Sequence, residues 1–169
     1  VYPWMKSHHL GDINILVSFA LLPALGTFFV AVGAYDTQSL LMILPIGLIT
    51  VAILHANNTR DVKTDLQAGL GTITTSVSLM NAKAIYTFEI FAPYALALLY
   101  VVLLGQPWTL LAVVLTLPLA LRNVRTMIQA EDDLPYRGIL RLDQTTAQLQ
   151  MAFGLLYALG FFLGSWLGV

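Results

Sequence analysis

The sequence predicts an all-α integral membrane helical bundle with five transmembrane helices, forming a single domain over residues 1–169. Two features of composition support this class. Of the 169 residues, 58% are hydrophobic and only 10% are charged, whereas about a quarter of the residues in a typical soluble domain are charged. The mean hydropathy is +0.79. A chain this apolar, with so little charge to solvate it, needs a lipid bilayer around it.

Five apolar segments are long enough to span a membrane, because a helix of about 20 residues crosses a hydrocarbon core of roughly 30 Å. In chain order the expected spans are residues 13–35, 38–56, about 85–104, 107 to about 121, and about 149–169. The first four contain internal prolines, namely Pro23, Pro45, Pro93 and Pro118. Neighbouring helices can satisfy the carbonyls that such prolines free. Pro107 suits the first turn of the fourth span.

The positions of the basic residues give the orientation of the bundle. With five spans, the N-terminal segment and the two long connections lie on one face of the membrane. These segments carry all eight basic residues, which are Lys6, Arg60, Lys63, Lys83, Arg122, Arg125, Arg137 and Arg141. The opposite face carries Asp36 as its only charge. The positive-inside rule makes the basic face cytoplasmic, and we expect the bacterial inner membrane.

Charge and cysteine content exclude several function classes. The net charge is −1, so no basic surface indicates nucleic acid binding. The absence of cysteine excludes disulfides, thiolate metal sites and a cysteine nucleophile. The sequence starts at Val1 rather than at methionine, and we interpret this start as an internal one that leaves N-terminal helices missing.

The polar segment after the second span carries the residues that can do chemistry. If the helix continues past Ala56, Asn57, Asp61 and Asp65 lie at i, i+4 and i+8 on one face. Two carboxylates one turn apart repel each other unless a cation lies between them, and oxygen ligands of this kind suit Mg²⁺. Arg60 adds a planar donor set that matches phosphate oxygens. Two solvated acids on an exposed helix are the alternative, which the depth of the segment disfavours.

This segment resembles a known family motif. Residues 57–61, Asn-Asn-Thr-Arg-Asp, with Asp65 and Gly69 beyond them, are similar to the second aspartate-rich motif of the UbiA superfamily of intramembrane prenyltransferases. The Asn-Asn-x-Arg-Asp form resembles the menaquinone-pathway branch, which prenylates 1,4-dihydroxy-2-naphthoate. Tyr-Pro-Trp-Met-Lys at residues 2–6, Leu-Gly-Asp at 10–12 and Thr-Thr-Ala-Gln-Leu at 145–149 are also similar to family segments.

The resemblance implies a fold, a cofactor and substrates. The family has nine helices, and this chain matches the last five; the first aspartate-rich motif has no counterpart here, and Leu70 stands where many members have lysine. The implied substrates are a polyprenyl diphosphate and an aromatic acceptor, and the implied cofactor is Mg²⁺. Mg²⁺ would stabilise the charge that develops as the allylic C–O bond breaks. Without the missing helices, this chain alone is expected to show no turnover.

The resemblance also assigns roles to residues. Asp61 and Asp65 are the expected catalytic residues and metal ligands, Asn57 supports both the metal and the diphosphate, and Arg60 and Lys6 bind the diphosphate. A 4-hydroxybenzoate or other phenol acceptor, a cation-binding transporter-like bundle and a non-catalytic fragment are the alternatives.

Two further polar residues lie in the apolar segments, and neither is expected to take part in the reaction. We expect a structural role for His55, with a hydrogen bond to the site as the alternative. For Glu89 we expect a snorkelling or helix-start acid, with a hydrogen bond across helices as the alternative.

Overall fold

The structure is a computed structural model that describes residues 11–131 and 137–169, and these residues contain helices and no strand. In order they are α2 (Gly11–Leu16), the π-helical η1 (Val17–Leu21), α3 (Leu22–Val32), α4 (Thr37–Gln67), α5 (Ile73–Ser76), α6 (Leu79–Leu104), the 3₁₀ helix η2 (Trp108–Thr116), α7 (Leu117–Ile128), the 3₁₀ turn η3 (Arg137–Ile139) and α8 (Leu142–Leu167). Among these described residues, five helical stretches are long and apolar enough to cross a membrane, the first being α2–η1–α3 and the fourth η2–α7. The all-α membrane bundle is therefore confirmed.

The second span is longer than the expected residues 38–56. Helix α4 has 31 residues, or about 46 Å of helix, which exceeds a hydrocarbon core of roughly 30 Å. No glycine or proline interrupts the polar residues after Ala56, so the helix continues until Gly69 adopts a φ of 66°. There the Leu70 N–H donates to the Asp65 carbonyl at 2.9 Å. The motif residues 57–65 consequently lie on one continuous helix.

The other expected boundaries also differ from the structure, mostly because polar residues extend the helices beyond the apolar runs. The first span covers residues 11–32, the third 79–104, the fourth 108–128 and the fifth 142–167. Helix α6 starts early because the Ser78 hydroxyl caps it, accepting the Asn81 N–H at 3.3 Å. Pro107 precedes η2 as its cap instead of lying in its first turn.

Internal prolines change the helices locally. The π-helical η1 ends two residues before Pro23, and the 3₁₀ helix η2 ends two residues before Pro118, since each proline lacks the N–H that would continue α-helical bonding. Pro45 leaves the carbonyl of Leu41 without its usual donor four residues on. The Tyr100 hydroxyl of α6 donates to that carbonyl at 2.6 Å. A neighbouring helix thus satisfies a freed carbonyl, as membrane helices require.

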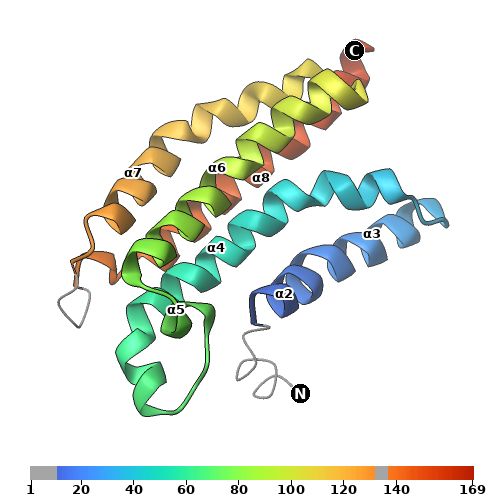
Figure 1. The fold of residues 1–169 in the computed structure, drawn as a ribbon. Helices are drawn as coiled ribbons and strands as arrows, with labels where there is room; N and C mark the ends of the chain where they lie inside the picture. Colours follow the sequence, from blue (N-terminus) through green and yellow to red (C-terminus); the bar gives the residue numbers. More distant parts are fainter. Residues whose placement is uncertain (1–10, 132–136) are drawn as a thin grey trace.

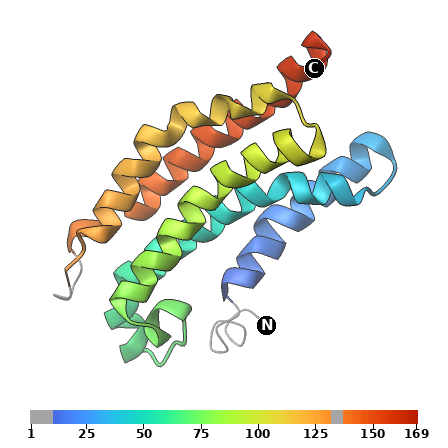
Figure 2. The same ribbon diagram turned by 45° about the horizontal axis from the view of Figure 1, so that its top comes forward.

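Helix α4 is the centre of the bundle. It packs against α6 and α8, and the first span lies along it on the remaining side (Figure 1). The other view shows η2 and α7 lying along α8 (Figure 2). In both views the end of α4, the starts of α6 and α8, and the end of α7 lie at the same end of the bundle. Both long connections therefore meet the same membrane face.

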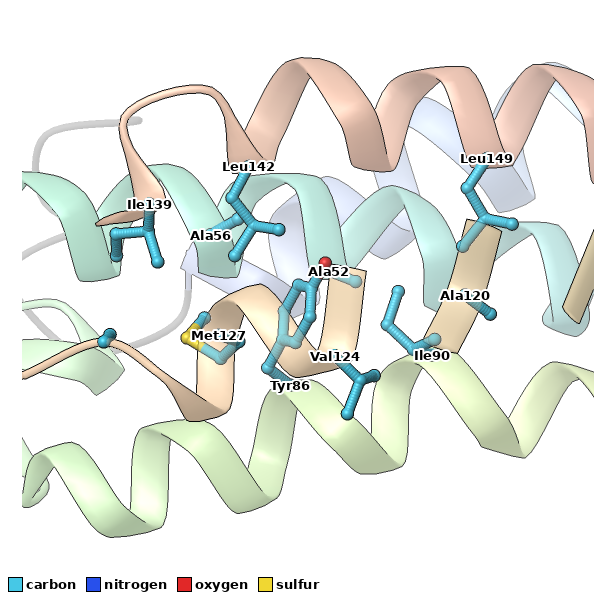
Figure 3. Close-up of a cluster of buried hydrophobic side chains, with 11 residues drawn as sticks. Ala52, Ala56, Tyr86, Ile90, Ala120, Val124, Met127, Ile139, Leu142 and Leu149 are labelled. Carbon is cyan, nitrogen blue, oxygen red and sulfur yellow. The ribbon is translucent and has the colours of Figure 1, made fainter. Parts of the chain in front are cut away.

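A buried apolar cluster lies under the polar end of the bundle. Tyr86 and Ile90 of α6 converge with side chains of α4, α7 and α8 (Figure 3). The Tyr86 hydroxyl forms a 2.7 Å hydrogen bond with the Thr146 hydroxyl of α8. A second cluster, around Leu110 and Phe153, holds η2 against α8. These clusters fix how α4 and α8 face each other, and with them the polar residues at their ends.

Candidate functional site

Arg60 lies at the centre of a polar cluster on the last turns of α4. Its Nε donates to Asp61 Oδ1 at 2.9 Å and its Nη2 donates to Asp61 Oδ2 at 3.0 Å. Nη2 also donates to Asn57 Oδ1, one turn earlier. Nη1 reaches across to α8 and donates to Asp143 Oδ2 at 2.7 Å. We call these four residues the Arg60 cluster; it joins the second span to the fifth.

The two acids of the motif differ in their surroundings. The side chain of Asp61 is 37% exposed, whereas Asp65, one turn further along, is buried with 7% of its surface exposed. Residues four apart on a helix have their Cβ atoms about 5–6 Å from each other. Their carboxylates can therefore approach a common ligand, with one acid open to solvent and the other inside the bundle.

The donor set on this face fits Mg²⁺. Asn57, Asp61 and Asp65 offer only oxygen ligands to a cation, which is the preference of this ion. A carboxylate has about four lone-pair sites, so Asp61 can accept from Arg60 and still ligate a cation. Holding a cation between an acid–amide helix face and a bound phosphate is thus chemistry that the arrangement permits.

The structure engages Arg60 more fully than the sequence indicated. A guanidinium has five N–H donors, and four hydrogen bonds to Asn57, Asp61 and Asp143 occupy most of them. A diphosphate would have to replace one of these protein acceptors to gain a bidentate contact. The diphosphate contact of Arg60 stays a prediction, and that of Lys6 lies outside the described residues.

Asp143 was missed by sequence reasoning. It lies at the start of α8, two residues before the Thr-Thr-Ala-Gln-Leu stretch, and an acid at that point is an ordinary feature of a helix N-terminus. Only the packing of α8 against α4 shows that its partner is Arg60, 83 positions earlier in the chain.

Comparison with known proteins agrees with the motif. The sequence profile described as the UbiA prenyltransferase family matches residues 1–142. The chain belongs to the UbiA prenyltransferase family. It is similar to proteins called UbiA prenyltransferase domain-containing protein 1: 33% identical over 158 residues in Gallus gallus, covering 91% of this chain and 44% of the relative, and 34% identical over 163 residues in Danio rerio, covering 94% and 45%. The Drosophila melanogaster homolog is 34% identical over 149 residues, covering 88% and 39%.

The match to the UbiA family includes all three oxygen donors of the motif and Arg60. The chain spans less than half the length of these curated relatives. The relatives named here are animal proteins, so they give no support to the expected bacterial inner membrane. Family membership makes the Arg60 cluster a candidate substrate site instead of a surface ion pair.

The hydrogen-bonded ion pair between Arg60 and Asp143 should contribute measurably to the stability of the folded chain. We expect Asp143→Asn and Arg60→Gln each to lower the free energy of unfolding, and the two together to cost less than their sum, with a coupling energy of about 1 kcal/mol. The wild type, the two single variants and the double variant would each be unfolded with denaturant in detergent micelles, with circular dichroism as the signal. Strictly additive effects would mean that the contact contributes nothing.

Proposed function

We propose that this chain supplies the second aspartate-rich half of a Mg²⁺-dependent intramembrane prenyltransferase. The enzyme would transfer a polyprenyl group from a polyprenyl diphosphate to an aromatic acceptor. The observation that carries the proposal is the face formed by Asn57, Asp61 and Asp65 where an apolar helix leaves the bundle, in a chain that matches the UbiA prenyltransferase family over residues 1–142.

Each residue of the site has a proposed role in this reaction. Asp61, Asp65 and Asn57 would hold the metal ion, and Arg60 and Lys6 would bind diphosphate oxygens. When bound, Mg²⁺ would supply charge neutralisation for the departing diphosphate. The Arg60 cluster holds Asp61 and Asn57 beside each other before substrate arrives, and Arg60 would exchange one of its protein acceptors for a diphosphate oxygen when substrate binds. The apolar side chains of the bundle would exclude water from the allylic carbon, which favours attack by the aromatic ring over hydrolysis.

A groove along the bundle supports a path for the isoprenoid tail. It has a volume of about 250 Å³ and runs between the first span, α4 and α8. Mostly apolar side chains line it, among them Ala24, Phe28, Met42, Ile46, Tyr157 and Phe161. Because it lies along the earlier turns of α4, a long apolar chain leaving the acids and following this helix would reach it. Burial of such a chain explains why the enzyme must reside in lipid.

The identity of the aromatic acceptor and the orientation of the bundle in the membrane are more specific proposals. We propose 1,4-dihydroxy-2-naphthoate, in menaquinone biosynthesis, because residues 57–58 are Asn-Asn and residues 11–12 are Gly-Asp, as in the naphthoate-prenylating branch; 4-hydroxybenzoate or another phenol is the alternative. We propose that the basic face meets the cytosol. The first aspartate-rich motif would come from N-terminal helices of the same protein.

A transfer assay tests this function. Full-length protein in lipid nanodiscs would be incubated with labelled polyprenyl diphosphates of several lengths, with and without Mg²⁺, and with naphthoate, 4-hydroxybenzoate or no acceptor. We expect labelled prenyl naphthoate product that requires Mg²⁺. Product from the phenol alone would overturn the acceptor assignment, and no product with any acceptor would overturn the function.

A further inference from the structure

A second polar cluster lies inside the bundle and shares no residue with the Arg60 cluster. Asp12 of α2, His55 of α4 and Glu89 of α6 bring one ligand atom each to within 4.8 Å of one another. His55 Nδ1 lies 3.8 Å from Glu89 Oε1. His55 is fully buried and Glu89 is 5% exposed. Three spans therefore each contribute one titratable side chain to the same point, where ionisable groups are costly and indicate function.

A hydrogen bond determines which ring nitrogen of His55 carries the proton, and therefore which one is free to accept on the side of the two acids. His55 Nε2 lies 3.0 Å from the carbonyl oxygen of Ala82. A carbonyl only accepts, so Nε2 carries the proton and donates it. In the neutral ring, Nδ1 then carries a free lone pair, and Nδ1 is the ring nitrogen that lies 3.8 Å from Glu89 Oε1. A ring oriented by a backbone carbonyl through its other nitrogen is the usual arrangement of a metal-ligating histidine.

Two atoms of the cluster lack the partners that buried polar atoms normally have. Within residues 11–131 and 137–169, neither His55 Nδ1 nor Glu89 Oε2 has a hydrogen-bond partner. In the same part of the chain, no lysine or arginine forms an ion pair with Asp12 or Glu89. Two carboxylates and a lone pair that lie this close together in the bundle need either protons or compensating positive charge. A divalent cation would neutralise both acids and satisfy both atoms at once.

We propose that Asp12, His55 and Glu89 form a second divalent-cation site, selective for an imidazole-preferring transition metal such as Zn²⁺ over Mg²⁺. Zinc–ligand bonds of about 2.0–2.2 Å place neighbouring ligand atoms roughly 3.4 Å apart. Side-chain rotations that move the ligand atoms by about 1 Å would therefore bring them to zinc-binding distance. His55 precedes Asp61 by six residues, about 9 Å along α4. The site is thus separate from the Mg²⁺ site proposed above and does not depend on prenyl transfer.

Metal binding at this site would fasten the first span to the bundle. The first span is mostly exposed, with 6% of its apolar window buried within the chain, while α4 and α6 pack extensively on each other. A cation shared by Asp12, His55 and Glu89 adds a link between α2 and that packed pair.

Metal binding can be measured without any substrate. Residues 1–169 contain three histidines, His8, His9 and His55, so a His8→Ala/His9→Ala variant leaves His55 as the only imidazole in this part of the protein. In this background, protein in nanodiscs is expected to retain one Zn²⁺ per chain after dialysis. Co²⁺ should give visible d–d bands that Zn²⁺, but not excess Mg²⁺, abolishes. Zn²⁺ should also raise the thermal unfolding midpoint.

Single substitutions then assign the ligands. His55→Ala and Glu89→Gln should each weaken Zn²⁺ binding more than about 10-fold, and Glu89→Gln keeps the side-chain volume in case the first variant fails to fold. Glu131→Gln, at an exposed acid after α7, should leave Zn²⁺ affinity unchanged. Absence of bound Zn²⁺, its retention by folded Glu89→Gln protein, or its loss in Glu131→Gln would overturn the proposal.

Discussion

Replacing Asp61 with asparagine is expected to lower kcat/KM for prenyl transfer at least about 100-fold. The substitution keeps the size of the side chain but removes the charge that would hold the metal ion. It also replaces one of the two carboxylate oxygens that accept hydrogen bonds from Arg60 with an NH₂ group, which cannot accept. The measurement is the initial rate of product formation by the full-length protein with labelled polyprenyl diphosphate, over a range of Mg²⁺ concentrations.

Two controls separate the metal role of Asp61 from its contact with Arg60. Arg60→Gln breaks the same pair without removing a metal ligand, so its dependence on Mg²⁺ concentration should stay close to that of the wild type even if its rate falls. Glu131→Gln changes an exposed acid after α7 and should leave the rate unchanged. Normal Mg²⁺-dependent transfer by Asp61→Asn would show that this carboxylate is not a ligand.

The fold could be predicted to a large extent because its determinants are local. Each apolar run is long enough for one membrane crossing. The number of crossings follows from the basic residues, because five crossings place all of them on one side of the membrane. The ends of the helices could not be read from the same signal. Residues 57–67 are mostly polar, yet they continue α4. Hydropathy reports where the lipid ends, whereas α4 ends where Gly69 adopts a left-handed backbone conformation.

The same distinction between local spacing and long-range packing applies to the candidate site. The shared face of Asn57, Asp61 and Asp65 was predictable, since spacing along one helix determines it. The partnership of Arg60 with Asp143 was not, because it depends on α8 packing beside α4. The same holds for His55 and Glu89. The structural role expected for His55 is present in its bond to Ala82, but its approach to Asp12 and Glu89 requires knowing which three spans are neighbours.

Side-chain size at the interface between α8 and η2 decides how closely these elements approach. Where helices pack in lipid, small residues let backbones come together. A Cβ added at Gly160 would lie 2.8 Å from the Thr109 carbonyl oxygen and 2.9 Å from Leu110 Cα. Both are backbone atoms and cannot rotate away. The Thr109 hydroxyl also donates to the Gly160 carbonyl at 2.5 Å, so a shift of α8 would break this bond as well.

Gly160→Ala is therefore expected to lower the free energy of unfolding by about 2 kcal/mol. Gly154→Ala is the matched control on the same helix, because a Cβ there meets no atom within 4 Å. Alanine is the better helix former by about 1 kcal/mol, so the control should be neutral or stabilising. Unfolding titrations of both variants in the same detergent would compare the signs. Equal effects at the two positions would mean that the close approach of α8 to η2 does not hold the fourth and fifth spans together.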